Sequence, residues 1–230
     1  MYPQPQIETN SQLQYLQTSS DSKTAVILFH GYGASMMDLY GLADMVDTKE
    51  SIDWIFPNGH IELHPTMMAR AWFPLDEKAL DEAMRSGTHR DFSELNHPEF
   101  QDAVEKCSKF ISAMSEKYDK LIVGGFSQGS MISTHAALRN SHKVSALICL
   151  SGALIAKESI LEAFDIKDAN NFPFFQSHGK DDAILSYSYA KQLFGLLKLG
   201  GHEGEFISFD GGHEIPMIVL TKLNKFLNRI

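Results

Sequence analysis

A serine between two glycines, where an apolar run meets a helical pattern, is the residue of this chain with the clearest chemical meaning. Ser127 stands in Gly125-Phe-Ser-Gln-Gly129, directly after the apolar run 121–123. A serine on a sharp strand-to-helix turn exposes its hydroxyl at the helix N-terminus. Glycines flank such a turn because side chains there would collide with backbone. We therefore predict that Ser127 is a nucleophile, although the same pattern is also typical of a glycine-rich turn with a surface serine.

A serine hydroxyl is a poor nucleophile near neutral pH, so a base and an orienting carboxylate must accompany it. After such a turn they follow in the order Asp, then His. Asp181 and Asp182 follow the predicted strand 172–177, and His213 follows the predicted strand 205–209. These residues follow the carboxyl ends of strands, where open α/β sheets place ligands. We expect a Ser–His–Asp triad, for which local sequence leaves both aspartates open.

The same chemistry needs an oxyanion hole, in which backbone N–H groups lie about 3 Å from the developing oxyanion. One donor is expected from Gln128, which follows the nucleophile, and the other from a loop after an earlier strand. The segment His30-Gly-Tyr-Gly-Ala-Ser35 is such a loop, and its two glycines let the backbone approach a ligand closely. By itself the segment is equally typical of a tight turn. We choose the N–H of Tyr32 as the second donor.

The remaining histidines show no comparable pattern. His178 is expected to be structural, held by hydrogen bonds in the turn after its strand. Ordinary loop or surface positions are expected for His64, His89, His97 and His202. No His or Cys pair has the spacing of a zinc finger, a zinc ribbon or a zincin. We therefore expect no metal site, and the proposed chemistry requires no cofactor.

The composition excludes several classes of protein. The 230 residues are 43% hydrophobic and 21% charged, which indicates one soluble α/β domain. The net charge of -9 with scattered basic residues argues against nucleic-acid binding. No apolar stretch reaches the ~18 residues of a transmembrane helix, and the polar N-terminus lacks the pattern of a signal peptide. Cys107 and Cys149 are typical of reduced core residues. We expect a cytoplasmic protein, and a homodimer is compatible with the sequence.

Short apolar runs alternate with helical patterns, which predicts an α/β fold with a mostly parallel, twisted sheet and helices on both faces. The predicted strands are 13–16, 25–29, 52–56, 121–123, 146–150, 172–177 and 205–209. The predicted helices are 37–46, 98–117, 128–138, 160–164, 188–199 and 214–227. Loops and short elements are expected over 58–95. We assign 1–21 to a polar tail with the first edge strand, and 22–230 to a single domain.

Together these motifs resemble the carboxylesterase and phospholipase family of α/β-hydrolases, which includes the acyl-protein thioesterases. The matching segments run in family order: His30–Ser35, Arg70-Ala-Trp-Phe73, Gly124–Ser130, His178-Gly-Lys-Asp-Asp182 and Gly212-His-Glu-Ile215. The resemblance implies an α/β-hydrolase fold, selects Asp182 over Asp181, and implies that Gln128 and Tyr32 shape the oxyanion hole. It also implies a flexible cover over an acyl groove, before the Arg70 segment. The stretch 75–95 is longer and more polar than the family's usual connection, which leaves open whether it acts as a lid.

We expect a serine hydrolase that cleaves esters or thioesters of acyl chains. Its substrates would be small molecules, lipids or acylated proteins, with lysophospholipase or acyl-protein thioesterase activity as narrower alternatives. A catalytically silent ligand- or partner-binding module is the alternative of another class, and it predicts a missing triad residue, yet Ser127, Asp182 and His213 are all present.

For the acyl-binding residues we choose Met67, Met68 and Trp72. The two methionines are flexible and apolar, which suits a loosely shaped acyl groove. They are equally compatible with filling a gap in the core.

Overall fold

An eight-stranded sheet forms the centre of the molecule, with the strand order β1-β2-β4-β3-β7-β8-β9-β10. The computed structural model describes residues 3–18, 21–95, 97–166 and 169–230. The strands from β4 to β10 in that order pair in parallel, and β1 and β2 extend the sheet antiparallel at one edge. The strands are β1 (Gln6–Ile7), β2 (Gln14–Gln17), β3 (Thr24–Phe29), β4 (Asp53–Pro57), β7 (Lys120–Phe126), β8 (Ala146–Leu150), β9 (Phe174–Gly179) and β10 (Gly204–Phe209). The predicted, mostly parallel sheet is confirmed.

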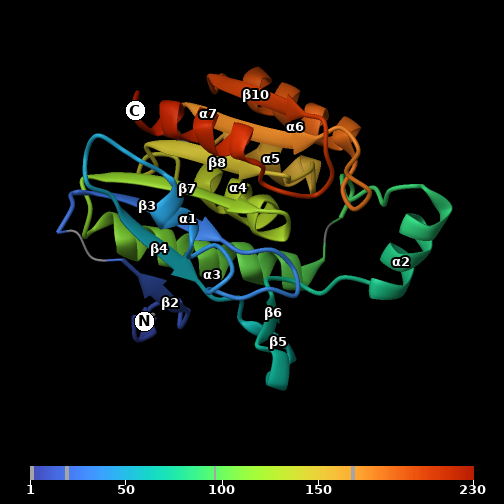
Figure 1. Cartoon of the computed structure of the whole chain (residues 1–230), viewed down its shortest axis with the longest axis horizontal. Helices are drawn as coiled ribbons and strands as arrows, with labels where there is room; N and C mark the ends of the chain where they lie inside the picture. The colour runs from blue at the N-terminus through green and yellow to red at the C-terminus, as the bar shows by residue number, and fades with distance from the viewer. Residues whose placement is uncertain (1–2, 19–20, 96, 167–168) are drawn as a thin grey trace.

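Helices cover both faces of this sheet (Figure 1). One hydrophobic layer joins the sheet to α3, α4, α5 and α6, and the other joins it to α1 and α7. These helices are α1 (Leu42–Met45), α3 (Pro98–Ser115), α4 (Gln128–Arg139), α5 (Lys157–Phe164), α6 (Tyr187–Leu199) and α7 (Met217–Leu227). Because strands buried on both faces need apolar side chains on both, β3 and β8 are continuous apolar runs.

Two predicted helices are shorter than the sequence pattern suggested. Within 37–46, only α1 is α-helical, and the preceding residues make i to i+3 turns, such as Tyr40 N–H to Met37 O. Gly41 lies just before α1, where its flexibility disfavours a longer helix. The last helix begins at Met217, not at 214, because Pro216 restricts the residue before it to extended backbone.

The segment 58–95 is more ordered than the sequence suggested. It contains a hairpin of β5 (Ile61–His64) and β6 (Ala69–Ala71), joined by the 3-10 helix Pro65–Met67. It also contains α2 (Glu77–Ser86), a ten-residue helix with no buried residue. The hairpin and α2 both project from the body of the molecule in Figure 1.

The structure also bears on the predictions for the two cysteines, for His202 and for a transmembrane helix. Cys107 and Cys149 are free and buried, as expected. His202 is buried, which corrects its assignment to the surface; its Nδ1 accepts the Phe172 N–H at 3.3 Å. In the described part of the chain, no helix has both the length and the apolar character needed to span a bilayer.

Candidate active site

Ser127 occupies the sharp turn between β7 and α4. Its backbone has φ 56° and ψ -122°, a region that residues with a Cβ seldom adopt. The turn is held by a hydrogen bond from the Ser127 N–H to Leu150 O, at 2.9 Å. A Cβ on Gly129 would collide with the carbonyl of Phe29, and a Cβ on Gly125 would collide with the backbone of Gly129. The close packing of β7, β3 and α4 therefore requires both glycines, and it presents Ser127 at the carboxyl ends of the parallel strands.

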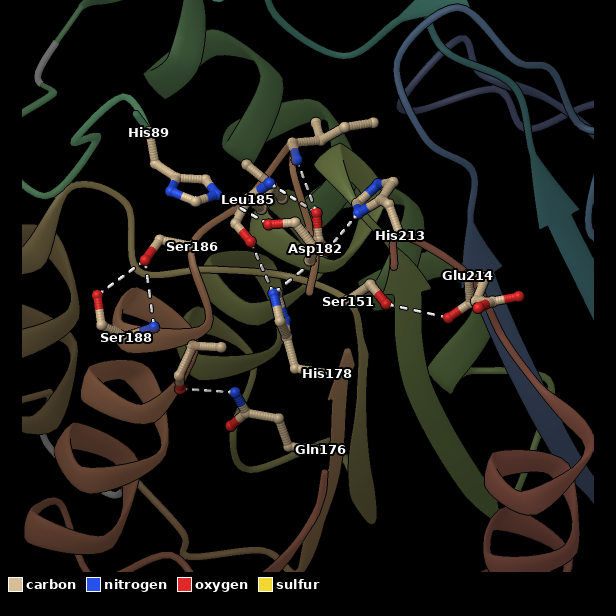
Figure 2. A network of polar contacts seen from close by, with 12 residues as sticks. His89, Ser151, Gln176, His178, Asp182, Leu185, Ser186, Ser188, His213 and Glu214 are labelled. Atoms are coloured by element: carbon tan, nitrogen blue, oxygen red, sulfur yellow. Dashed lines mark hydrogen bonds and ion pairs between the residues drawn. The ribbon is translucent and has the colours of Figure 1, made fainter. Parts of the chain in front are cut away.

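Asp182 and His213 meet at the carboxyl ends of the same sheet, in the loops after β9 and β10. His213 Nδ1 lies 2.7 Å from Asp182 Oδ2, with the carboxylate fully buried and 12% of the imidazole side chain exposed (Figure 2). The imidazole packs against Phe126, with ring centroids 4.8 Å apart. Ser127 and His213 both line one pocket. Asp181 is exposed, and the structure brings Asp182 to the histidine in its place.

The environment of Asp182 keeps its carboxylate ionised. Oδ1 accepts the N–H groups of Ile184 at 2.8 Å and Leu185 at 2.9 Å. Burial alone would raise the pKa of Asp182, but the hydrogen bonds from His213 and from these two N–H groups lower it below its usual value. An ionised Asp182 fixes the proton of His213 on Nδ1 and leaves Nε2 free to act as a base.

Two further histidines hold the Asp182 loop, and Figure 2 shows both. His178 Nε2 donates to Leu185 O at 2.9 Å and lies 3.3 Å from Asp182 Oδ2. Burial lowers the pKa of His178, so this histidine is neutral and structural, as the sequence suggested. His89 Nε2 donates to the Asp182 carbonyl at 2.8 Å. The expectation of an ordinary loop residue is therefore corrected for His89, which reaches the Asp182 loop from 93 residues away in sequence.

Two backbone hydrogen bonds fix the loop after β3 to Arg70 in β6. Gly33 N–H donates to Arg70 O at 2.9 Å, and Arg70 N–H donates to Ala34 O at 2.8 Å. Within the loop, His30 Nδ1 donates to Gly31 O at 2.7 Å, and its Nε2 accepts the Gly59 N–H at 2.9 Å. Burial lowers the pKa of His30 to about 4, so the ring stays neutral and keeps both bonds.

Gln128, which follows Ser127, connects this loop to the turn between β7 and α4. Its side-chain oxygen accepts the Trp72 N–H at 2.9 Å, and its side-chain nitrogen donates to Phe73 O at 2.7 Å. Trp72 in turn donates its indole N–H to His30 O at 2.8 Å. Among the described residues, the backbone N–H groups of Tyr32 and Gln128 have no hydrogen-bond acceptor. Both groups therefore remain available to an oxyanion.

A pocket of about 270 Å³ opens beside Ser127. Its wall also includes Gly31, Tyr32, Ala34, Asp38, Phe126, Gln128 and His213. The rest of the wall is apolar and consists of Leu75, Leu80, Phe92, Met131, Ile184 and Leu185. The pocket is therefore suited to an apolar chain that leads away from the nucleophile.

The structure does not bring the predicted acyl-binding residues to this pocket. Met67 and Met68 are 72% and 63% exposed, because the β5–β6 hairpin pairs with itself and directs its turn outward. They therefore neither line the pocket nor fill the core. Trp72 is fully buried and holds the loop after β3 through the hydrogen bond from its indole N–H to His30 O. Sequence reasoning missed two residues that line the pocket, Leu75 and Leu80. Leu80 lies in the unpredicted helix α2, and Leu75 lies just before it.

Comparison with known proteins agrees with this geometry. The phospholipase/carboxylesterase family matches residues 14–230. The acyl-protein thioesterase 1 of Candida albicans is 28% identical over 226 residues, which is 92% of this chain and 94% of that protein. The relative from Schizosaccharomyces pombe with the same name is 28% identical and covers 78% of this chain and 80% of its own length.

Solved structures share the fold at lower identity. Esterase PE8 has a TM-score of 0.76 at 23% identity, covering 91% of this chain and 93% of its own. Zea mays acyl-protein thioesterase 2 has a TM-score of 0.74 at 19% identity, covering 94% and 97%. The chain therefore belongs to the phospholipase/carboxylesterase family of α/β-hydrolases and is a hydrolase of carboxylic esters or thioesters.

Proposed function

We propose that Ser127, His213 and Asp182 are the catalytic triad with which this hydrolase removes acyl chains from thioesters and oxygen esters. The observation that carries the proposal is the 2.7 Å contact between His213 and Asp182 beside the strained turn of Ser127. An imidazole oriented by a buried carboxylate is the arrangement that activates a serine hydroxyl.

The reaction has two halves. Ser127 Oγ attacks the carbonyl carbon while His213 Nε2 takes its proton, and the N–H groups of Tyr32 and Gln128 stabilise the resulting oxyanion. The intermediate collapses as His213 gives the proton to the leaving thiol or alcohol, which leaves an acyl-Ser127 ester. Water, deprotonated by His213, then attacks this ester, and the carboxylic acid leaves as Ser127 regains a proton.

The apolar wall of the pocket is the proposed acyl-binding surface. Leu75, Leu80 and Phe92 line it together with Met131 and Leu185. Each methylene group that the wall removes from water contributes about 0.8 kcal/mol to binding. Several relatives are named acyl-protein thioesterases, and we extend the proposal to S-acylated proteins as natural substrates.

The test is a series of nitrophenyl esters of increasing acyl length beside one acyl thioester, assayed on the wild type and on Ser127→Ala. We expect Ser127→Ala to lose several orders of magnitude in kcat. A fluorophosphonate probe should label the peptide that contains Ser127. Ser208→Ala, which changes an exposed serine of β10, should leave both results unchanged. Equal labelling of wild type and Ser127→Ala would reject the proposal.

A further inference from the structure

The two ends of the pocket pack against different hydrophobic layers. At one end, Phe92, Met131 and Leu185 belong to the hydrophobic layer that contains α3 to α6. At the other end, Phe126 packs against the opposite layer, together with Met36 and other residues of the 36–40 loop. The nucleophile lies between these ends, so an ester bound at Ser127 must direct its acyl chain to one end and its leaving group to the other.

The position of His213 indicates which end takes the leaving group. In the proposed reaction, His213 protonates the departing thiol or alcohol, so the leaving group must lie beside this imidazole. The His213 ring packs on Phe126 at the second end, with centroids 4.8 Å apart. The continuous apolar wall around Leu75 and Leu80 is then left for the acyl chain.

Asp38 gives the leaving-group end its charge. Of the described residues that line the pocket, it is the only carboxylate, and it comes from the 36–40 loop that packs on the same layer as Phe126. Its side chain is exposed and has no hydrogen bond or ion pair to any described residue, and the desolvation of its covered part raises its pKa.

Asp38 is an exposed residue of the pocket wall, so its charge acts on a bound leaving group across water-like surroundings and attracts a group of positive charge. Resting on the proposed function, we infer that Asp38 selects leaving groups that carry a positive charge close to the scissile thiol or alcohol. The same residue disfavours leaving groups with a phosphate or sulfonate at that position. This specificity favours a thioester on a basic peptide over an anionic lysophospholipid.

Three octanoate esters with leaving groups of nearly equal shape test the inference. They are the esters of choline, of its neutral isostere 3,3-dimethylbutanol, and of the anionic 2-hydroxyethanesulfonate. Opposite charges about 4 Å apart gain roughly 1 kcal/mol in water-like surroundings, which corresponds to about fivefold. We expect kcat/KM of the wild type to favour the choline ester over the neutral ester by about fivefold and the neutral over the anionic ester by a similar factor.

In Asp38→Asn, the three values should converge to within about twofold, and in Asp38→Lys the order should reverse. Asp44→Asn removes an exposed charge from α1, outside the pocket, and should keep the wild-type ratios. The wild-type preference should also shrink as salt rises, because the site reaches solvent. Octanoyl thioesters of peptides with Lys or Glu beside the acylated cysteine extend the test to protein-like substrates, and the Lys peptide should be the faster.

The outcomes separate this inference from the proposed function. If Ser127→Ala still hydrolyses the esters, the triad assignment fails. If the wild type hydrolyses all three esters through Ser127 at equal rates, or if Asp38→Asn keeps the wild-type ratios, the triad stands and the role of Asp38 is rejected.

Discussion

The loops after β9 and β10, which carry the proposed triad residues Asp182 and His213, and the helix α2 contribute to the same pocket, yet they are held in very different ways. Asp182 is buried, its carboxylate accepts three hydrogen bonds from neighbouring residues, and it follows β9, a strand paired on both sides. By contrast, α2 has no buried residue, and a hydrogen bond from the Tyr32 hydroxyl to the Glu77 carboxylate connects it to the body.

This difference separates the chemistry from the selection of substrate. The triad must hold its geometry within a fraction of an ångström, so it lies on short loops that rigid strands position. An acyl pocket needs an apolar wall more than a fixed one, and Leu80 supplies part of the proposed wall from the weakly anchored helix α2. Substitutions in the two regions should therefore change different measured quantities.

The largest effect is expected at Asp182. Asp182→Asn should lower kcat by about 10⁴, because an amide favours the wrong tautomer of His213. Its KM should change little, since Asp182 lies outside the lining of the pocket. Steady-state kinetics on a nitrophenyl ester measures both constants. Asp181→Asn changes the exposed neighbouring residue and serves as the control. A larger loss in Asp181→Asn than in Asp182→Asn would reassign the triad.

The second largest effect is expected from acid, which should lower the free energy of unfolding through two buried histidines. Burial lowers the pKa of His30 and of His135 to about 4, from an ordinary value of 6.5. Between these values the unfolded chain binds more protons than the folded one, so stability is lost as pH falls through this window. Each histidine should remove on the order of 2–3 kcal/mol from the free energy of unfolding by pH 4.5.

Urea unfolding at pH 7 and pH 4.5 measures this loss. His135→Gln replaces a ring whose Nε2 donates to Ile155 O with an amide that does not titrate, so the difference between the two pH values should shrink. His142→Gln, at an exposed position, should leave the difference as in the wild type. An unchanged difference in His135→Gln would show that this histidine is not kept neutral by the core.

The same contrast explains what could be predicted from sequence. Ser127 and the strand before it follow strong local rules, because the turn needs glycines and a doubly covered strand needs a continuous apolar run. The choice between Asp181 and Asp182 depended on a family pattern, since adjacent residues differ only in which one the turn directs inward. His89 had no local signal at all, because its bond to Asp182 O joins residues that are close only in the fold.

The helix α2 was missed although its signals were present. Asp76 caps it, apolar residues follow at helical spacing, and Gly87 ends it in the left-handed conformation with φ 68°. The Pro, His and charged residues around it made the whole stretch resemble loop. Placing the acyl groove at Met67 and Met68 had a related cause, since apolar composition does not reveal whether a hairpin turns toward the site or away from it.

A moderate effect is expected at Leu80. Leu80→Ser should reduce the ratio of kcat/KM for octanoyl over butyryl esters by about tenfold, because loss of contact with one to two methylenes costs roughly 1–1.5 kcal/mol. The double substitution of Met67 and Met68 by serine should leave the ratio unchanged, since both side chains are exposed away from the pocket. If the double variant flattens the ratio and Leu80→Ser does not, the hairpin forms the acyl groove after all.

The smallest effect is expected at the N-caps of α2 and α6. It tests most directly whether α2 is held less firmly than the helices that pack into the core. Asp76 accepts the Ala79 N–H at 3.0 Å, and Ser186 accepts the Ser188 N–H at 3.2 Å at the start of α6. Loss of either cap should cost about 1 kcal/mol. Because α6 packs into the core, Ser186→Ala should lower the free energy of global unfolding by that amount.

Asp76→Ala should instead act locally, because α2 contributes no buried residue to the cooperative core. Amide exchange within α2 should speed up about fivefold, while global unfolding in urea stays within about 0.3 kcal/mol of the wild type. If Asp76→Ala lowers global stability as much as Ser186→Ala does, α2 unfolds with the core. The wall that carries Leu80 would then be as rigid as the triad, and chain-length preference would have to arise from a fixed pocket shape instead of a weakly held segment.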